Sequence, residues 1–163
     1  MRLSTRTIAF AGMFTAIAFV LRLLSFTTLE YRFTFDDIAI MASAIFFGPW
    51  VGLLVGFGVD FLYSLYMGFP LGIFTLASMS WGLIAGVLLF KNTDSIARFS
   101  LGIVITSVVA FGITTLALFQ LFNTGIIPGL PARLITMVIK WPVQVSVLWI
   151  LVQRTKQLFL FDR

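Results

Sequence analysis

Few side chains in this sequence could do chemistry, and they are unevenly placed. There is no cysteine and no histidine, so thiolate or imidazole catalysis, disulfides and the common zinc sites are excluded. The acidic residues are Glu30, Asp36, Asp37, Asp60, Asp94 and Asp162. Asp36 and Asp37 are adjacent, but no second group converges on them as in a two-acid catalytic site, and no nucleophile–base pair or phosphate-binding loop is visible. We therefore expect a binding protein rather than an enzyme, with no metal and no cofactor.

A cluster of charges interleaved with aromatic rings lies between the first two apolar stretches. Its charged members are Arg22, Glu30, Arg32, Asp36 and Asp37, and its rings are Tyr31, Phe33 and Phe35. A planar polar ligand needs this combination of stacking faces and orienting polar groups. A solvated loop with internal salt bridges is the alternative, and each such bridge would contribute little to stability. On the first interpretation, Arg32, Asp36 and Asp37 are candidate substrate contacts.

Further polar residues fall inside or beside the later apolar stretches. They are Asp60, Trp81, Gln120, Asn123, Arg133, Lys140, Trp141 and Gln144. A charge within a membrane span costs about 2.5–3.5 kcal/mol on insertion scales, so intramembrane charges are functional candidates. Lys140 would either anchor substrate or be structural, reaching the membrane surface or pairing with Asp60, and Asp60 would close one end of the bundle or contact ligand. The candidate substrate contacts in this part are Trp81, Gln120, Asn123, Arg133 and Lys140, although interfacial aromatic belts also explain tryptophan.

The elements that must position these residues are membrane helices. Of 163 residues, 60% are hydrophobic and 10% charged, whereas a soluble domain is about half apolar and a quarter charged. The net charge of +5 comes from scattered cations with no phosphate-binding stripe, so no nucleic acid partner is expected. Because about 20 apolar residues cross a bilayer, the sequence predicts an all-α integral membrane protein, a six-helix bundle forming one domain over residues 1–163. The expected spans are 7–24, 33–47, 50–66, 73–90, 99–122 and 134–152, with a tight turn at Gly48-Pro49.

The distribution of cations predicts the orientation in the membrane. With the N-terminus inside, seven cations fall in cytoplasmic segments: Arg2, Arg6, Lys91, Arg98, Arg154, Lys156 and Arg163. Only Arg32 and Arg133 fall in outer segments. This positive-inside bias predicts that both termini are cytoplasmic and that loops 25–36, 67–72 and 123–132 face outward.

Small residues recur at four-residue spacing on three of the predicted helices. They form the rows Gly48–Gly52–Gly56, Gly82–Gly86 and Gly12–Ala16, and Ala9 shares a face with the last row. Such rows let another backbone approach closely, either within the bundle or from a second membrane protein. Internal packing is the more common use. The first helix is the best candidate for docking, because the face with Ala9, Gly12 and Ala16 carries few polar groups.

Four segments resemble the substrate-binding S component of energy-coupling factor (ECF) vitamin transporters, most closely the folate family. The segments are RFTF at 32–35, FFGPWVGLLVGFGVDFL at 46–62, FTLASMSWGLIAGVLLFK at 74–91 and PARLITMVIKWPVQVSVLWILV at 131–152. The F-G-P-x-x-G-x-x-x-G-x-x-x-D run is the most specific, followed by P-x-R with P-x-Q eleven residues later. Folate-type members usually carry Gly-Phe where this chain has Asp36-Asp37, and a lysine where it has Thr136. Losing a cation and gaining two acids favours a smaller or less acidic heterocycle, such as hydroxymethylpyrimidine or pyridoxine.

The resemblance implies a substrate-specificity subunit of an ATP-driven importer in the bacterial plasma membrane. Such a subunit binds its vitamin at the outer face and docks through its first helix, here Ala9, Gly12 and Ala16, on a transmembrane coupling subunit. Two cytoplasmic ATPases would then drive a toppling motion that carries the cavity inward. The main alternative is a small membrane scaffold protein with no transported ligand. A lipid-modifying enzyme and a freestanding transporter are further alternatives.

Overall fold

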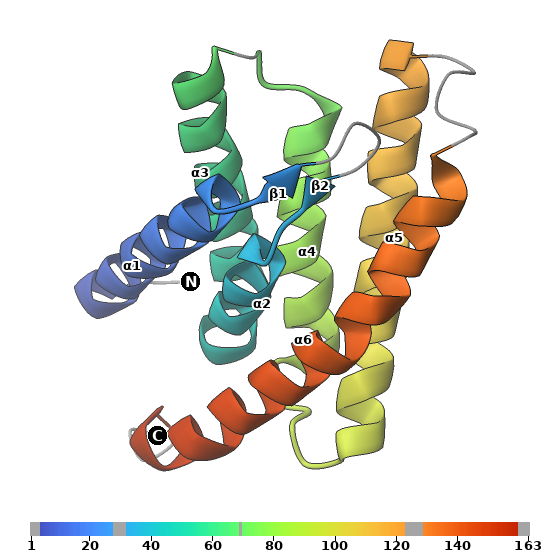
Figure 1. Ribbon diagram of the computed structural model, residues 1–163. Helices are drawn as coiled ribbons and strands as arrows, with labels where there is room; N and C mark the ends of the chain where they lie inside the picture. Colours follow the sequence, from blue (N-terminus) through green and yellow to red (C-terminus); the bar gives the residue numbers. More distant parts are fainter. Residues whose placement is uncertain (1–3, 28–31, 69, 123–128, 160–163) are drawn as a thin grey trace.

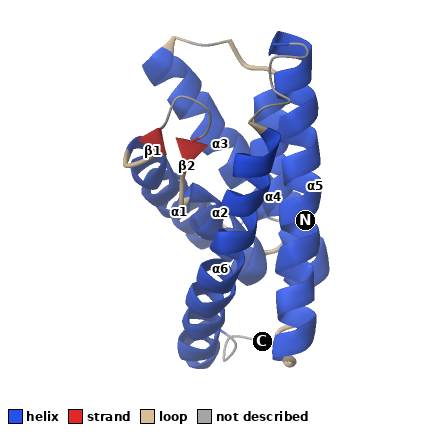
Figure 2. Cartoon of the chain, turned by 45° about the vertical axis from the view of Figure 1, so that its right-hand side comes forward, coloured by secondary structure: helices blue, strands red, loops and turns tan. Residues whose placement is uncertain are grey.

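The computed structural model describes residues 4–27, 32–68, 70–122 and 129–159 (Figure 1). Within those ranges the helices are α1 Thr5–Leu23, α2 Asp36–Phe47, α3 Pro49–Met67, α4 Ile73–Leu89, α5 Ile96–Phe122 and α6 Leu130–Phe159. Figure 2 shows that helix accounts for almost all of the described chain. By length and composition, α1, α3, α5 and α6 can each cross a membrane. The predicted six-helix membrane fold is confirmed.

The second helix differs most from its expected span. α2 begins at Asp36 rather than at residue 33, because β2 (Arg32–Phe33) pairs antiparallel with β1 (Phe26–Thr27) in the preceding loop. Asp36 and Asp37 form its first turn, where the partial positive charge of a helix N-terminus favours carboxylates. Its 12 residues extend only about 18 Å at 1.5 Å per residue, short of the ~30 Å hydrocarbon layer. α2 therefore cannot cross the membrane alone.

A tight turn joins α2 to α3 at the expected Gly48-Pro49 pair. Gly48 has a φ of +97°, which glycine adopts without the Cβ clash that other residues meet. Pro49 is the first residue of α3, where the missing N–H would have no helical partner in any case. The turn reverses the chain within one residue, so α2 and α3 lie side by side.

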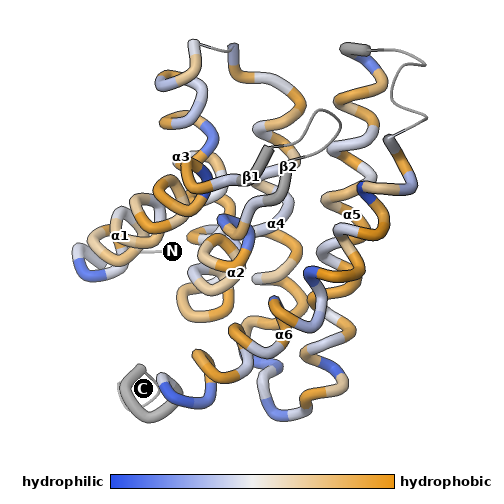
Figure 3. Tube along the Cα trace, in the orientation of Figure 1, coloured by the Kyte–Doolittle hydropathy of each residue, from blue (hydrophilic) through white to orange (hydrophobic). Residues whose placement is uncertain are grey.

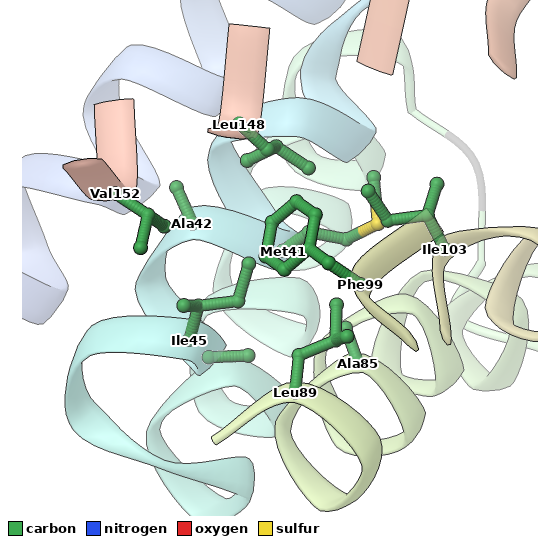
Figure 4. Packing of buried hydrophobic residues seen from close by; sticks show 10 residues of the cluster. Met41, Ala42, Ile45, Ala85, Leu89, Phe99, Ile103, Leu148 and Val152 are labelled. Atoms are coloured by element: carbon green, nitrogen blue, oxygen red, sulfur yellow. The ribbon is translucent and has the colours of Figure 1, made fainter. Parts of the chain in front are cut away.

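α2 lies in the middle of the bundle and contacts α1, α3, α4 and α6 (Figure 1). A helix that is apolar around its circumference is stable only when it is enclosed. Figure 4 shows its side chains in the core shared with α4, α5 and α6. The labelled residues there are Met41, Ala42 and Ile45 of α2, Ala85 and Leu89 of α4, Phe99 and Ile103 of α5, and Leu148 and Val152 of α6. The longer helices therefore shield the short one from lipid.

Much of the exterior of the bundle is apolar. Figure 3 shows hydrophobic residues along all of the described helices. Large side chains such as Val87, Leu116 and Ile150 are exposed on their outer faces. Apolar surface on this scale marks contact with a membrane or with another membrane protein.

Two of the small-residue rows pack against each other inside the bundle. A Cβ built on Gly82 would lie 2.0 Å from the carbonyl oxygen of Gly52, and one built on Gly56 would lie 2.3 Å from the carbonyl oxygen of Ser78. A Cβ on Gly86 would lie 2.3 Å from the Cα of Pro49. Backbone meets backbone along this α3–α4 seam, so no larger residue fits. For these rows, internal packing is the correct interpretation.

Candidate binding site

A buried ion cluster around Arg22 joins the first four helices. The guanidinium on α1 contacts Asp36 of α2 through Nη2 at 2.6 Å and Asp60 of α3 through Nη1 at 2.8 Å. Nη2 also donates to Ser78 Oγ of α4 at 3.0 Å. Thr75 Oγ1, also on α4, donates to the second oxygen of Asp60 at 2.6 Å. Of the two roles expected for Asp60, these contacts support the structural one.

A second cluster, around Asp37, joins α2 to α5 and α6. Lys140 Nζ and Gln144 Nε2, one turn apart on α6, both donate to Asp37 Oδ2, the amide at 2.9 Å. The other oxygen of Asp37 accepts from the backbone N–H of Ile38 at 2.9 Å. Gln144 Oε1 in turn accepts from Ser107 Oγ of α5 at 3.4 Å. The carboxylate is therefore held on both oxygens, and it holds two side chains of α6.

Among the alternatives considered for Lys140, the pair with Asp60 is not the one that the structure shows. Asp60 pairs with Arg22, and Lys140 pairs with Asp37. The reason lies in the first turn of α2, where consecutive residues point about 100° apart around the helix axis. Asp36 is directed towards α1 and Asp37 towards α6. Two adjacent acids thus serve two separate clusters.

A cavity of about 170 Å³ lies between α4, α5 and α6 beside the Asp37 cluster. Trp81 of α4 and Phe111 of α5 line it with aromatic rings. Hydroxyl groups come from Ser107, Thr114 and Thr136, and the remaining lining residues are Ala110, Arg133, Met137, Lys140 and Gln144. Flat aromatic faces and a few convergent polar groups in a concave space are the usual composition of a small-molecule site.

Arg133 is the most distinctive residue of this cavity. Its guanidinium lies over the ring of Phe111, 5.1 Å from the centroid. Its Nη1 atom is buried and has no hydrogen-bond partner among the described residues. A buried charged donor without an acceptor is costly, and nearly all such groups in folded proteins are satisfied. This arrangement suits a hydrogen-bond acceptor or an anion at Nη1 of Arg133.

The structure brings three of the predicted contacts together and separates the others. Trp81, Arg133 and Lys140 line the cavity. Asp36 and Asp37 do not line it, because they are held in the ion clusters described above. Gln120 is exposed near the end of α5 and is not part of the lining. The side chain of Arg32, like Asn123, lies outside the described residues.

Several lining residues are absent from the sequence-based set of contacts. On α5 they are Ser107, Ala110, Phe111 and Thr114, and on α6 they are Thr136, Met137 and Gln144. Their positions repeat at three- and four-residue spacing, which places each set on one helix face. Ser107 and Thr114 lie seven residues apart, two helical turns, and this spacing is the signal that could have identified the α5 face. Nothing in the sequence indicates that this face meets α6.

The small-residue row of α1 has surroundings unlike those of the α3–α4 seam. Ala9, Gly12 and Ala16 are all exposed. A Cβ built on Gly12 would have no heavy atom within 4 Å. This strip of α1 therefore remains open in the isolated chain.

Comparison with known proteins assigns the sequence to a family. The family model described as "ECF transporter, substrate-specific component" matches residues 6–157. The chain belongs to this family. It is therefore a multi-pass membrane protein and the substrate-specific component of an ECF transporter. No curated protein matches the sequence.

A solved structure shares the fold of this ECF component. It is FolT bound with folic acid, which is 24% identical in sequence over 90% of this chain and 92% of FolT, with a TM-score of 0.79. At that identity the likeness establishes the arrangement of the helices. It confirms the expected S-component architecture.

Proposed function

We propose that this chain is the substrate-specificity subunit of an ECF-type importer and binds a water-soluble heterocyclic vitamin in the α4–α5–α6 cavity. The observation that carries the proposal is the unpartnered Nη1 of Arg133 in a cavity that also has Trp81 and Phe111 in its wall. Aromatic faces can stack on a heterocycle, and the guanidinium can fix one of its acceptor atoms. FolT, which shares the fold, was solved with folic acid. Folate or a smaller hydroxymethylpyrimidine- or pyridoxine-like compound is the proposed substrate class.

The proposed contacts fall into three groups. Trp81, Arg133 and Lys140 touch the substrate in the cavity. Arg32, Gln120 and Asn123 are further proposed contacts outside the described lining, and Asp36 and Asp37 act by holding other side chains. The chain itself catalyses no reaction in this proposal.

Transport requires partners, which we propose to be a transmembrane coupling subunit and two cytoplasmic ATPases. The proposed docking strip is Ala9, Gly12 and Ala16 on α1, whose exposure leaves room for a second helix backbone. In the proposed orientation both termini are cytoplasmic in a bacterial plasma membrane, with the cavity opening outward. The exposed cations Arg6, Lys91, Arg98 and Arg154 support it, because they all lie near helix ends on the proposed inner side.

The first test is to purify the chain from vitamin-replete cells and identify the small molecule that travels with it by mass spectrometry. A stoichiometric heterocyclic vitamin supports the proposal. An empty preparation that shows no thermal shift across a panel of vitamins would overturn it and favour the scaffold alternative.

The second test examines the cavity directly. Arg133→Gln should weaken binding of the identified vitamin about tenfold or more, because a charge-assisted hydrogen bond contributes about 1.5–3 kcal/mol. Arg154→Gln is the matched control, since Arg154 is an exposed cation at the far end of the same helix. Isothermal titration of both variants measures the effect. Equal affinities for the parent and Arg133→Gln would place the site elsewhere.

A further inference from the structure

We propose that Asp37 sets the electrostatic character of the cavity and restricts its ligand to a compact heteroaromatic ring with a single anionic or strongly accepting group. This inference rests on the proposed function, because it assumes that the α4–α5–α6 cavity is the substrate site. Asp37 itself does not line the cavity. It acts as a positioning and specificity-determining residue through the cavity wall.

The charges around the cavity carry the argument. Among the described lining residues, Arg133 and Lys140 are cationic and none is acidic. Lys140 is paired with Asp37, whose side chain is only 5% exposed. The fields of two opposite charges in contact largely cancel at a third charged group nearby. In a poorly solvated interior this cancellation changes the energy of the third group more than it would in water. Among the described residues, the cavity therefore presents one cation without an ionic partner, Arg133, rather than two.

The hydrogen bonds show that Asp37 is committed to this arrangement. Its Oδ2 accepts from both Lys140 and Gln144, and its Oδ1 accepts from the N–H of Ile38. Gln144 therefore directs its amide NH₂ towards Asp37 and its carbonyl oxygen towards the hydroxyl of Ser107. Lys140, Gln144 and Ser107 are thus engaged with protein partners. Among the described lining residues, the buried side-chain donor without a hydrogen-bond partner is Nη1 of Arg133, two turns before Lys140 on α6.

The size of the cavity leads to the same ligand class. Its volume of about 170 Å³ is below the roughly 300–1,000 Å³ of sites that enclose drug-sized ligands. One ring with one acceptor at Arg133 suits a cavity of this volume, whose walls include Trp81 and Phe111. A compound with two carboxylates, such as folic acid, would bring a second negative charge to a site with one uncompensated cation.

The experiment compares the charge selectivity of four proteins: the parent, Asp37→Asn, Lys140→Gln and the double variant. The probes are the compound identified by mass spectrometry, its analogue with the acidic or accepting group replaced by a neutral amide or hydrogen, and folic acid. Titration gives the affinity for the identified compound divided by the affinity for its neutral analogue. Asp37→Asn should raise that ratio about tenfold, Lys140→Gln should lower it about tenfold, and the double variant should restore the parent value.

A structural role alone would give a different pattern, because both single variants would then weaken the two probes equally. That result overturns the inference. If Asp37→Asn does not fold, Lys140→Gln still tests the opposite sign. Asp60→Asn is the matched control, since this buried carboxylate pairs with Arg22 in the other cluster, and it should leave the ratio unchanged.

The identity of the bound compound separates this inference from the proposed function. A single-ring compound with one acidic or accepting group supports both. Tight binding of folic acid by the parent supports the proposed function but overturns the limit on ligand charge. An empty protein that binds no vitamin overturns both.

Discussion

Two regions of this bundle use small residues in opposite ways. In the α3–α4 seam, Gly52 and Gly82 bring their backbones so close that an added Cβ would lie 2.0 Å from a carbonyl oxygen. On α1, Gly12 has the same four-residue relation to a small neighbour, yet a Cβ there would meet nothing within 4 Å. In the α3–α4 seam the glycine faces are buried against each other inside the bundle. On α1 the glycine face is exposed.

The two regions are also held to the rest of the molecule by different forces. Dispersion between interlocked backbones holds α3 against α4, as is usual between membrane helices that exclude no water on contact. α1 has open small residues on its exposed strip, and its C-terminal end is attached by the ion contacts of Arg22 with Asp36 and Asp60. α1 is thus attached by ion contacts near its C-terminal end and by packing of Phe10 and Phe14 against Phe47 of α2, while its small-residue strip stays open.

The largest effect is expected from filling the seam. Gly82→Leu places a side chain where the backbone of Gly52 lies, and a helix backbone cannot yield as a flexible side chain can. The cost should be about 3 kcal/mol or more, at the upper end of measured overpacking penalties, so little folded protein should be recovered. Size-exclusion chromatography and thermal unfolding in detergent would measure this. A Gly82→Leu protein as stable as the parent would contradict the described seam.

The next largest effect should come from the attachment of α1. Arg22→Met removes the cation that Asp36 and Asp60 share and leaves two buried carboxylates without it. Breaking a buried ion pair in this way costs about 3–5 kcal/mol when the charge left behind stays unpaired, and protonation of a carboxylate would reduce that cost. Thermal unfolding in detergent should show the loss, and Arg98→Met, which changes an exposed cation of α5, should not. Equal stability of the two variants would mean that the cluster does not hold α1.

The smallest effect on the isolated chain is expected from the open row of α1. A Cβ added at Gly12 meets no heavy atom within 4 Å, and leucine is the better helix former, so Gly12→Leu should change the free energy of unfolding by less than about 1 kcal/mol. The same change should abolish co-purification with the coupling subunit and vitamin uptake. Gly112→Leu is the control, since Gly112 on α5 is equally open but lies outside the proposed docking strip. If Gly12→Leu still assembles and transports, the docking strip lies elsewhere.

Local patterns in the sequence predict much of this fold, because a membrane enforces them strongly. Backbone groups in lipid must be satisfied within a helix, so a long apolar run has one available structure. The Gly48-Pro49 turn follows equally from local preferences, a positive φ at the glycine and a free first helical position at the proline. The start of α2 was misplaced because Arg32 and Phe33 pair with a strand of the preceding loop.

The sequence also supplied three of the cavity residues, Trp81, Arg133 and Lys140, because polar groups in apolar spans are conspicuous. It did not predict that Lys140 pairs with Asp37, 103 positions away along the chain. Spacing along one helix says which residues share a face, but not which other helix that face meets. How the helices pack decides which residue each buried charge pairs with. It also decides how the cavity is enclosed and whether each glycine row is buried or exposed. Those features are therefore decided by the tertiary structure alone.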